Sequence, residues 1–275
     1  MPAVDNNTVP RIHVIAALVA LTAALIARAL VQLEFREAGF THAFAADLSY
    51  LVVPPILVML LFPVLRRDRD QLLRQLAAAG CNRRMLVIAL VIGVLLRLAW
   101  WCHVIAGVAL GIYQDDGISQ AAGPEFTFQC PSLPILATGV LVMAILVPIV
   151  EETIHRGVVL SYLQGFGPVC AITGSAVVFT VYHPPGSWVF VFLAGIVFGA
   201  QYWITRSLWP SIVTHATVNG LIQIDWRCLQ GQWNPPTGEL PYPSIAAAAV
   251  TTLVICGVLI ITLLIQMHRG ENPPR

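Results

Sequence analysis

The sequence predicts an all-α protein, a polytopic bundle of about eight transmembrane helices. Hydrophobic residues make up 57% of its 275 residues, charged residues only 11%, and the mean hydropathy is +0.79. A soluble domain has about a quarter of its residues charged. Apolar runs long enough to cross a hydrocarbon core of roughly 30 Å recur along the whole chain. We therefore expect an integral protein whose main surroundings are the lipid bilayer. The net charge of +1 gives no sign of nucleic acid, and no such partner is expected.

Eight apolar segments are expected to span the membrane. They lie near residues 12–33, 48–65, 85–112, 133–163, 169–183, 187–205, 208–225 and 244–267. The fourth is longer than a crossing requires, so its end is expected to project or tilt. Prolines 184 and 185 with Gly186 predict a tight break between the fifth and the sixth. We divide this one integral domain into residues 1–132 with three helices, a core of four helices at 133–225, and residues 226–275 with the last helix.

The positions of the arginines predict the orientation of the bundle. Six of them lie in the loop after the second segment, namely Arg66, Arg67, Arg69, Arg74, Arg83 and Arg84. Loops rich in arginine stay in the cytoplasm, so counting segments from this loop places both termini there. Cys130 and Cys228 then fall in outer loops, where an oxidising compartment would allow a disulfide between them.

The fourth segment carries Glu151, Glu152, His155 and Arg156 within two helical turns. Each ionisable group inside a bilayer costs at least ~2.5 kcal/mol on insertion scales, so each needs a reason. Glu152 and Arg156 are four residues apart and are expected to pair along one face. Glu151 points roughly 100° away from Glu152 and is free to face a cavity. A purely structural ion pair between helices is the alternative, but one carboxylate would be enough for that.

Two further helices carry polar residues at a spacing of four. Phe179 and His183 share a face at the end of the fifth segment, and His215 and Asn219 share a face in the seventh. Taken singly, each pair is also explained by an interfacial histidine or by hydrogen bonds to a neighbouring helix. At 1.5 Å per residue, Glu151, His183 and His215 lie ~18, ~21 and ~10 Å from the inner ends of their helices. These depths are compatible with one cavity near the middle of the membrane.

Two features predict how the surrounding helices support this cluster. Gly195 and Gly199, in the stretch FLAGIVFG, predict a close approach of the sixth helix to a neighbour. Arg97 lies ~18 Å into the third segment and is expected to hold the glutamate pair ionised. Snorkelling, or pairing with a backbone carbonyl, is the alternative for this arginine.

Together, these segments resemble the CAAX protease and bacteriocin-processing (CPBP) family, which includes the type II CAAX prenyl endopeptidases. The family has three motifs, EExxxR, FxxxH, and HxxxN or HxxxD, the last preceded by a glycine-bearing helix. In order along this chain, the matching residues are Glu151, Glu152, Arg156, Phe179, His183, His215 and Asn219. The resemblance covers about residues 133–225. Each motif alone is weak, whereas all three in order on successive apolar helices are specific.

The resemblance implies an intramembrane endopeptidase that hydrolyses a peptide bond in a membrane-associated peptide or protein. It implies that Glu151, with His183, activates a water for attack on the peptide carbonyl. His215 and Asn219 would donate hydrogen bonds to the developing oxyanion. The other glutamate and the arginine of the first motif would orient the site electrostatically. A bacterial plasma membrane is the expected location.

No cofactor is expected. Two histidines with two glutamates could in principle hold zinc, but a glutamate mechanism needs no metal and no HExxH motif is present. One alternative is a non-catalytic membrane protein that binds a peptide or partner for immunity or scaffolding. A proton-coupled transporter with the glutamates as a relay is less favoured, because the sequence has no internal repeat. The motifs identify neither the substrate nor a role for prenylation.

Overall fold

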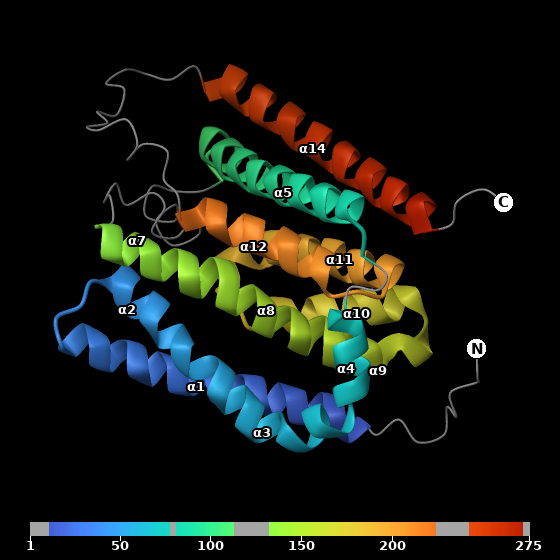
Figure 1. Ribbon diagram of the computed structural model, residues 1–275. Helices are drawn as coiled ribbons and strands as arrows, with labels where there is room; N and C mark the ends of the chain where they lie inside the picture. Colours follow the sequence, from blue (N-terminus) through green and yellow to red (C-terminus); the bar gives the residue numbers. More distant parts are fainter. Residues whose placement is uncertain (1–10, 78–80, 113–131, 224–241, 272–275) are drawn as a thin grey trace.

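The computed structural model describes residues 11–77, 81–112, 132–223 and 242–271, and the regular elements in these ranges are all helical (Figure 1). The first group consists of α1 Arg11–Glu37, α2 His42–Ser49, the 3-10 turn η1 Tyr50–Val52, α3 Val53–Arg67, α4 Arg69–Leu76 and α5 Arg83–Ala109. The next long helix is made of α7 Leu133–Gly139, η3 Val140–Leu146, α8 Val147–Glu152, η4 Thr153–Leu160, α9 Ser161–Leu163 and η5 Gln164–Phe166. The remaining elements are α10 Pro168–Val181, η6 Pro185–Ser187, α11 Trp188–Thr205, α12 Trp209–Gln223 and α14 Tyr242–Glu271.

The chain is an integral, multi-pass membrane protein, as predicted. Six stretches of the described residues are long and apolar enough to span: Ile15–Glu37, Phe44–Arg67, Arg83–Gly107, Leu133–Phe166, Pro185–Thr205 and Ser244–Arg269. All eight predicted segments contain helices, but α10 is a shorter apolar helix and α12 has only 15 residues. α12 packs between α5 and the long helix that runs from α7 to α9. Neighbouring helices therefore cover much of α12.

The second predicted segment lies within the helical stretch Phe44–Arg67 and contains one change of helix type. Pro54 and Pro55 lie in the first turn of α3, and proline has no N–H to donate to a preceding helical turn. The chain therefore passes from α2 through the 3-10 turn η1 before α3 begins. Ser49, the last residue of α2, is completely buried, and Tyr50 follows it as the first residue of η1.

The long fourth segment contains two π-helical stretches, η3 and η4, which flank α8. Pro148, near the start of α8, cannot donate to a carbonyl of the preceding turn, which favours a local departure from α-helical pairing. The two glutamates end α8, so η4 begins directly after them. π-Helical turns are rare and often lie at functional sites.

Small residues bring the helices around this segment together. A Cβ added at Gly93 of α5 would lie 2.6 Å from Thr217 Cβ of α12. A Cβ at Gly195 of α11 would lie 3.1 Å from Ala176 Cα of α10, and one at Gly199 would lie 3.1 Å from Ile172. The predicted close approach of the sixth helix is therefore confirmed, and its partner is α10, with which α11 forms a helical hairpin (Figure 1).

The arginine-rich segment is attached to one end of the bundle through α4. The start of α1 and the end of α14 lie at this same end (Figure 1). Gln75 donates a hydrogen bond from Nε2 to the Tyr202 hydroxyl at 2.6 Å, and its carbonyl accepts from Leu208 N at 3.1 Å. Trp209 Nε1 donates to Leu76 O at 2.7 Å. Side-chain and backbone hydrogen bonds thus hold α4 against the ends of α11 and α12. Cys130 and Cys228 lie outside the described residues.

Candidate active site

The predicted pair of the first motif is formed. Glu152 Oε1 lies 2.9 Å from Arg156 Nη1, and both side chains are 0% exposed. Arg156 also donates from Nη2 to the carbonyl of Gly195 on α11, at 3.0 Å. Its guanidinium carbon lies 4.8 Å from the ring centroid of Phe179 and 5.2 Å from that of Phe198. Arg156 is therefore held by a carboxylate, a carbonyl and two aromatic faces, with no opening to water.

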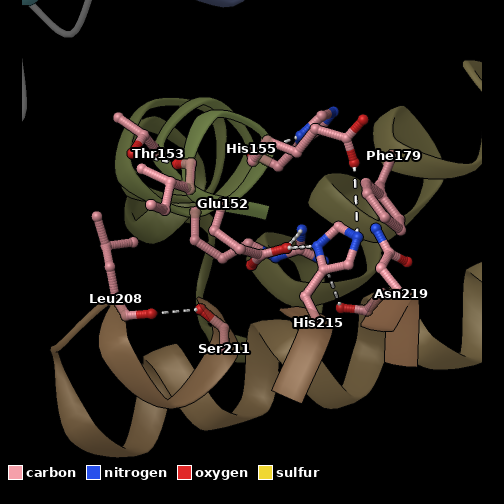
Figure 2. Close-up of polar contacts among 12 residues, drawn as sticks. Glu152, Thr153, His155, Phe179, Leu208, Ser211, His215 and Asn219 are labelled. Carbon is pink, nitrogen blue, oxygen red and sulfur yellow. Dashed lines mark hydrogen bonds and ion pairs between the residues drawn. The ribbon is translucent and has the colours of Figure 1, made fainter. Parts of the chain in front are cut away.

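His215, from α12, contacts both carboxylates of the motif. Its Nδ1 lies 2.9 Å from Glu152 Oε1, and its Nε2 lies 3.8 Å from Glu151 Oε2. Figure 2 shows the imidazole between the end of Glu152 and the side chains of Phe179 and Asn219. Because an ionised carboxylate can only accept, the hydrogen of this bond belongs to His215 Nδ1. The imidazole also stacks on Phe198, with 5.0 Å between centroids and 16° between the ring planes.

Glu151 is the more accessible carboxylate, and its side chain is 17% exposed. It lines a crevice of about 10 Å³ between η1, α3 and α8. The other lining residues are Tyr50, Val53, Pro54, Val147 and Val150. This volume is about what one water molecule needs. Glu151 Oε2 is buried and accepts no hydrogen bond from the described residues. The predicted pairing of Glu152 is thus confirmed, and Glu151 lies at a small crevice.

His183 is oriented by the residue four positions before it. Its Nδ1 lies 2.8 Å from the carbonyl oxygen of Phe179. Since a carbonyl only accepts, Nδ1 carries the hydrogen and Nε2 of a neutral ring keeps its lone pair. The His183 carbonyl in turn accepts from Trp188 Nε1 at 2.7 Å. The ring of Phe179 lies 4.6 Å from that of His183 and 5.7 Å from that of His215, and so separates the two imidazoles.

Asn219 lies one helical turn beyond His215 on α12. Its Nδ2 donates to the carbonyl of Met143 at 2.9 Å, in the π-helical segment η3. This bond uses one of the two N–H groups of the amide and fixes the direction of the side chain. The structure therefore brings the residues of the three motifs into one cluster at the interior of the bundle.

His155 and Arg97 are two further buried ionisable residues of the bundle. His155 Nδ1 lies 2.7 Å from the backbone oxygen of Glu151, so it contacts the main chain and not the carboxylate. Its Nε2 is buried and has no hydrogen-bond partner among the described residues. Arg97 is buried, but its guanidinium carbon lies 5.2 Å from the ring centroid of Trp101. The cation in contact with Glu152 is Arg156, and the expectation that Arg97 helps to hold the glutamate pair ionised stays a prediction.

Several groups at the site were missed from the sequence. The carbonyls of Gly195 and Met143 have no sequence signal, because every residue has a carbonyl. Phe198 lies within the stretch FLAGIVFG, three residues after Gly195 and therefore on the same helical face. This spacing is the signal that could have identified it. Tyr50 lies four residues before Pro54, and this spacing is the signal that could have placed it at a change of helix type. Among the described residues, no group of three or more His, Cys, Asp or Glu side chains is arranged to hold a metal ion.

The comparisons with known proteins agree with the motif-bearing segment. Residues 133–221 match the family model described as type II CAAX prenyl endopeptidase Rce1-like. No curated protein and no solved structure matches the chain. The matched segment begins with α7, ends within α12, and contains all the residues of the three motifs.

Proposed function

We propose that this chain, whose residues 133–221 match the type II CAAX prenyl endopeptidase model, is an intramembrane protease of the CPBP family. It hydrolyses its substrate with a water that Glu151 activates. The substrate is a membrane-associated peptide or protein. The observation that carries the proposal is the different surroundings of the two neighbouring carboxylates. Glu152 is clamped by Arg156 and His215, whereas Glu151 faces a crevice with room for about one water.

The reaction follows from the hydrogen-bonding capacity of each group. A water in the crevice donates to the Glu151 carboxylate, which takes its proton as the water oxygen attacks the peptide carbonyl carbon. Negative charge then moves to the carbonyl oxygen. The proton held by Glu151 passes to the amide nitrogen as the C–N bond breaks, so one product gains OH and the other gains H. His183, with a lone pair at Nε2, is suited to accept and return a proton in this step.

Two donors are available for the oxyanion. Asn219 keeps one N–H beyond the bond that it makes to Met143 O. His215 Nδ1 is occupied by Glu152 Oε1, so His215 donates from Nε2 when both ring nitrogens carry hydrogen. Donors fixed in advance, in surroundings without bulk water, stabilise a developing oxyanion far more strongly than solvent does. Arg156 is assigned an orienting role, since it holds Glu152, which in turn holds His215.

We propose that the reaction needs no metal. Glu152 Oε1 already accepts from Arg156 and His215. A metal at Glu152 would have to displace these partners, and a guanidinium 2.9 Å away opposes a second cation there. We also propose a bacterial plasma membrane with both termini cytoplasmic. The position of the arginine-rich α4 beside the start of α1 and the end of α14 supports this orientation.

The test is peptide cleavage by purified protein in detergent. Membrane-anchored peptides would be incubated with wild type, Glu151→Gln and His183→Ala, each with and without a chelator. Glu151→Gln keeps the shape of the side chain but cannot take a proton, so we expect a loss of roughly 10²–10⁴-fold in kcat. Gln71→Ala, on the exposed face of α4, is the control and keeps full activity.

Each outcome has a distinct meaning. Cleavage that survives the chelator but is lost in both site variants supports the glutamate mechanism. Cleavage that the chelator abolishes would replace it with a metal mechanism. Equal cleavage by wild type and Glu151→Gln would overturn the assignment of the base. Tight binding of peptides that are never cleaved would favour the non-catalytic alternative.

A further inference from the structure

Tyr50 faces the same crevice as Glu151, although it comes from η1, far outside residues 133–221. The other four lining residues are apolar, so Tyr50 and Glu151 are the two lining residues with polar side-chain groups. The crevice has room for about one water. A water there would have Glu151 and Tyr50 as its polar neighbours in the lining.

The ring of Tyr50 is held by a cation. Arg28, from α1, places its guanidinium carbon 3.5 Å from the ring centroid. Arg28 Nε also donates to Ser49 Oγ at 3.4 Å, and this buried hydroxyl donates to Ala46 O at 2.6 Å. A positive charge over an aromatic face is attracted to it and draws electron density from the ring. The O–H group of Tyr50 becomes a stronger hydrogen-bond donor as a result.

The hydroxyl of Tyr50 makes no hydrogen bond to any described residue, while other tyrosines of the bundle are bonded. Tyr202 OH, for example, accepts from Gln75 and contacts Ser161 Oγ at 2.9 Å. A tyrosine in a mostly apolar setting usually has a partner for its hydroxyl. For Tyr50 that partner is the content of the crevice.

We propose that Tyr50 is a further catalytic residue, which donates a hydrogen bond to the oxygen bound opposite Glu151. In the resting protein this oxygen belongs to the water that Glu151 activates. As the water gives its proton to Glu151, the same donor stabilises the negative charge that develops on the attacking oxygen. Arg28 is a positioning residue that acts through the ring of Tyr50. The inference rests on the proposed function, since it assigns a second group to the same reaction.

The experiment removes the hydroxyl and keeps the ring. Tyr50→Phe preserves the stack on Arg28, so packing between α1 and η1 is retained. We expect kcat to fall roughly 10²-fold, as when a single oxyanion donor is removed, with KM and the melting temperature unchanged. Tyr202→Phe is the matched control. It loses a hydroxyl that bonds α4 to the bundle, so its melting temperature falls while kcat stays at the wild-type value.

A binding measurement separates catalysis from structure. A phosphinic analogue of the cleaved peptide has a tetrahedral phosphorus with two oxygens, like the carbon of the intermediate. When a variant loses transition-state stabilisation, its affinity for such an analogue falls together with its kcat/KM. Tyr50→Phe should lower the affinity for the phosphinic peptide by the same factor as it lowers kcat/KM. The affinity for the product peptide should stay unchanged. Arg28→Gln should lower kcat in the wild-type background, but have no further effect in the Tyr50→Phe background.

Three results would overturn the inference. The first is Tyr50→Phe with wild-type kcat and wild-type affinity for the phosphinic peptide. The second is a loss of kcat that comes with an equal loss of product affinity and a lower melting temperature, which means a structural role. The third is a wild type that neither cleaves peptides nor binds the phosphinic peptide. By contrast, normal cleavage by Glu151→Gln together with impaired cleavage by Tyr50→Phe would overturn the proposed base and leave Tyr50 in place.

Discussion

Glu152 and Arg156 form an ion pair that is completely shielded from solvent, with 2.9 Å between Oε1 and Nη1. Both groups come from adjacent turns of one helix, and each has a further partner on another helix, His215 on α12 and Gly195 O on α11. Removing two charges from water is costly and is compensated only when such additional hydrogen bonds exist. The pair therefore joins three helices at the point where the site is built.

Arg156→Ala is expected to destabilise the fold strongly, because it leaves a buried carboxylate without its cation. Breaking a buried pair in this way costs about 3–5 kcal/mol. Unfolding of the purified protein by SDS in mixed micelles would measure the loss. The double variant Glu152→Gln with Arg156→Met leaves no uncompensated charge and should unfold at a higher SDS fraction than Arg156→Ala. Equal stability of wild type and Arg156→Ala would contradict this account of the pair.

Phe198→Leu is expected to slow catalysis without unfolding the protein. Leucine keeps most of the apolar volume but removes the ring stacked on His215. An aromatic pair contributes about 0.5–1.5 kcal/mol, so kcat should fall by up to about tenfold, with KM little changed. Phe190→Leu, on the same helix, is the control because its ring lies against Trp100 instead. A similar decrease of kcat in both variants would mean that the stack on His215 has no particular role.

Gly195→Ala should destabilise the bundle, against the usual effect of alanine in a helix. Alanine is better than glycine by up to about 1 kcal/mol where space allows. Here the new Cβ would lie 3.1 Å from Ala176 Cα, a backbone atom that cannot rotate away. Overpacking of this kind costs about 1–3 kcal/mol, so the net change is a loss. Gly165→Ala has open space around its Cβ and should be neutral in the same SDS unfolding measurement.

Gln75→Ala should loosen α4 from the bundle. The side chain is buried and donates to the Tyr202 hydroxyl at 2.6 Å, so its removal leaves that hydroxyl without one partner. Loss of one buried hydrogen bond costs about 1–3 kcal/mol. Limited proteolysis at the arginines around α4 should become faster, whereas Gln71→Ala, exposed on the same helix, should be cut at the wild-type rate. An unchanged rate in Gln75→Ala would mean that other contacts hold α4.

The sequence alone determined the class of fold and the members of the motif cluster. Runs of apolar residues indicate membrane helices because a helix satisfies its backbone hydrogen bonds within one segment, as the bilayer requires. Glu152 and Arg156 were predicted to pair, and they do, because residues four apart on a helix are neighbours whatever surrounds them. The same local rule explains why Phe179 could be matched with His183. Such relationships depend on helical geometry within a single element.

Only the tertiary structure decided the contacts between elements. The rotation of each helix and the closeness of its packing decide these contacts. They determine the cation that contacts Glu152, the carbonyl that accepts from Asn219, and the side chain that shares the crevice with Glu151. These quantities are set by steric fit at Gly93 and Gly195 and by the changes of helix type at η1, η3 and η4. Depth along the membrane can be estimated from the sequence, as for Arg97, but two residues at equal depth can face opposite sides of a bundle. Spacing along one chain contains no measure of that rotation.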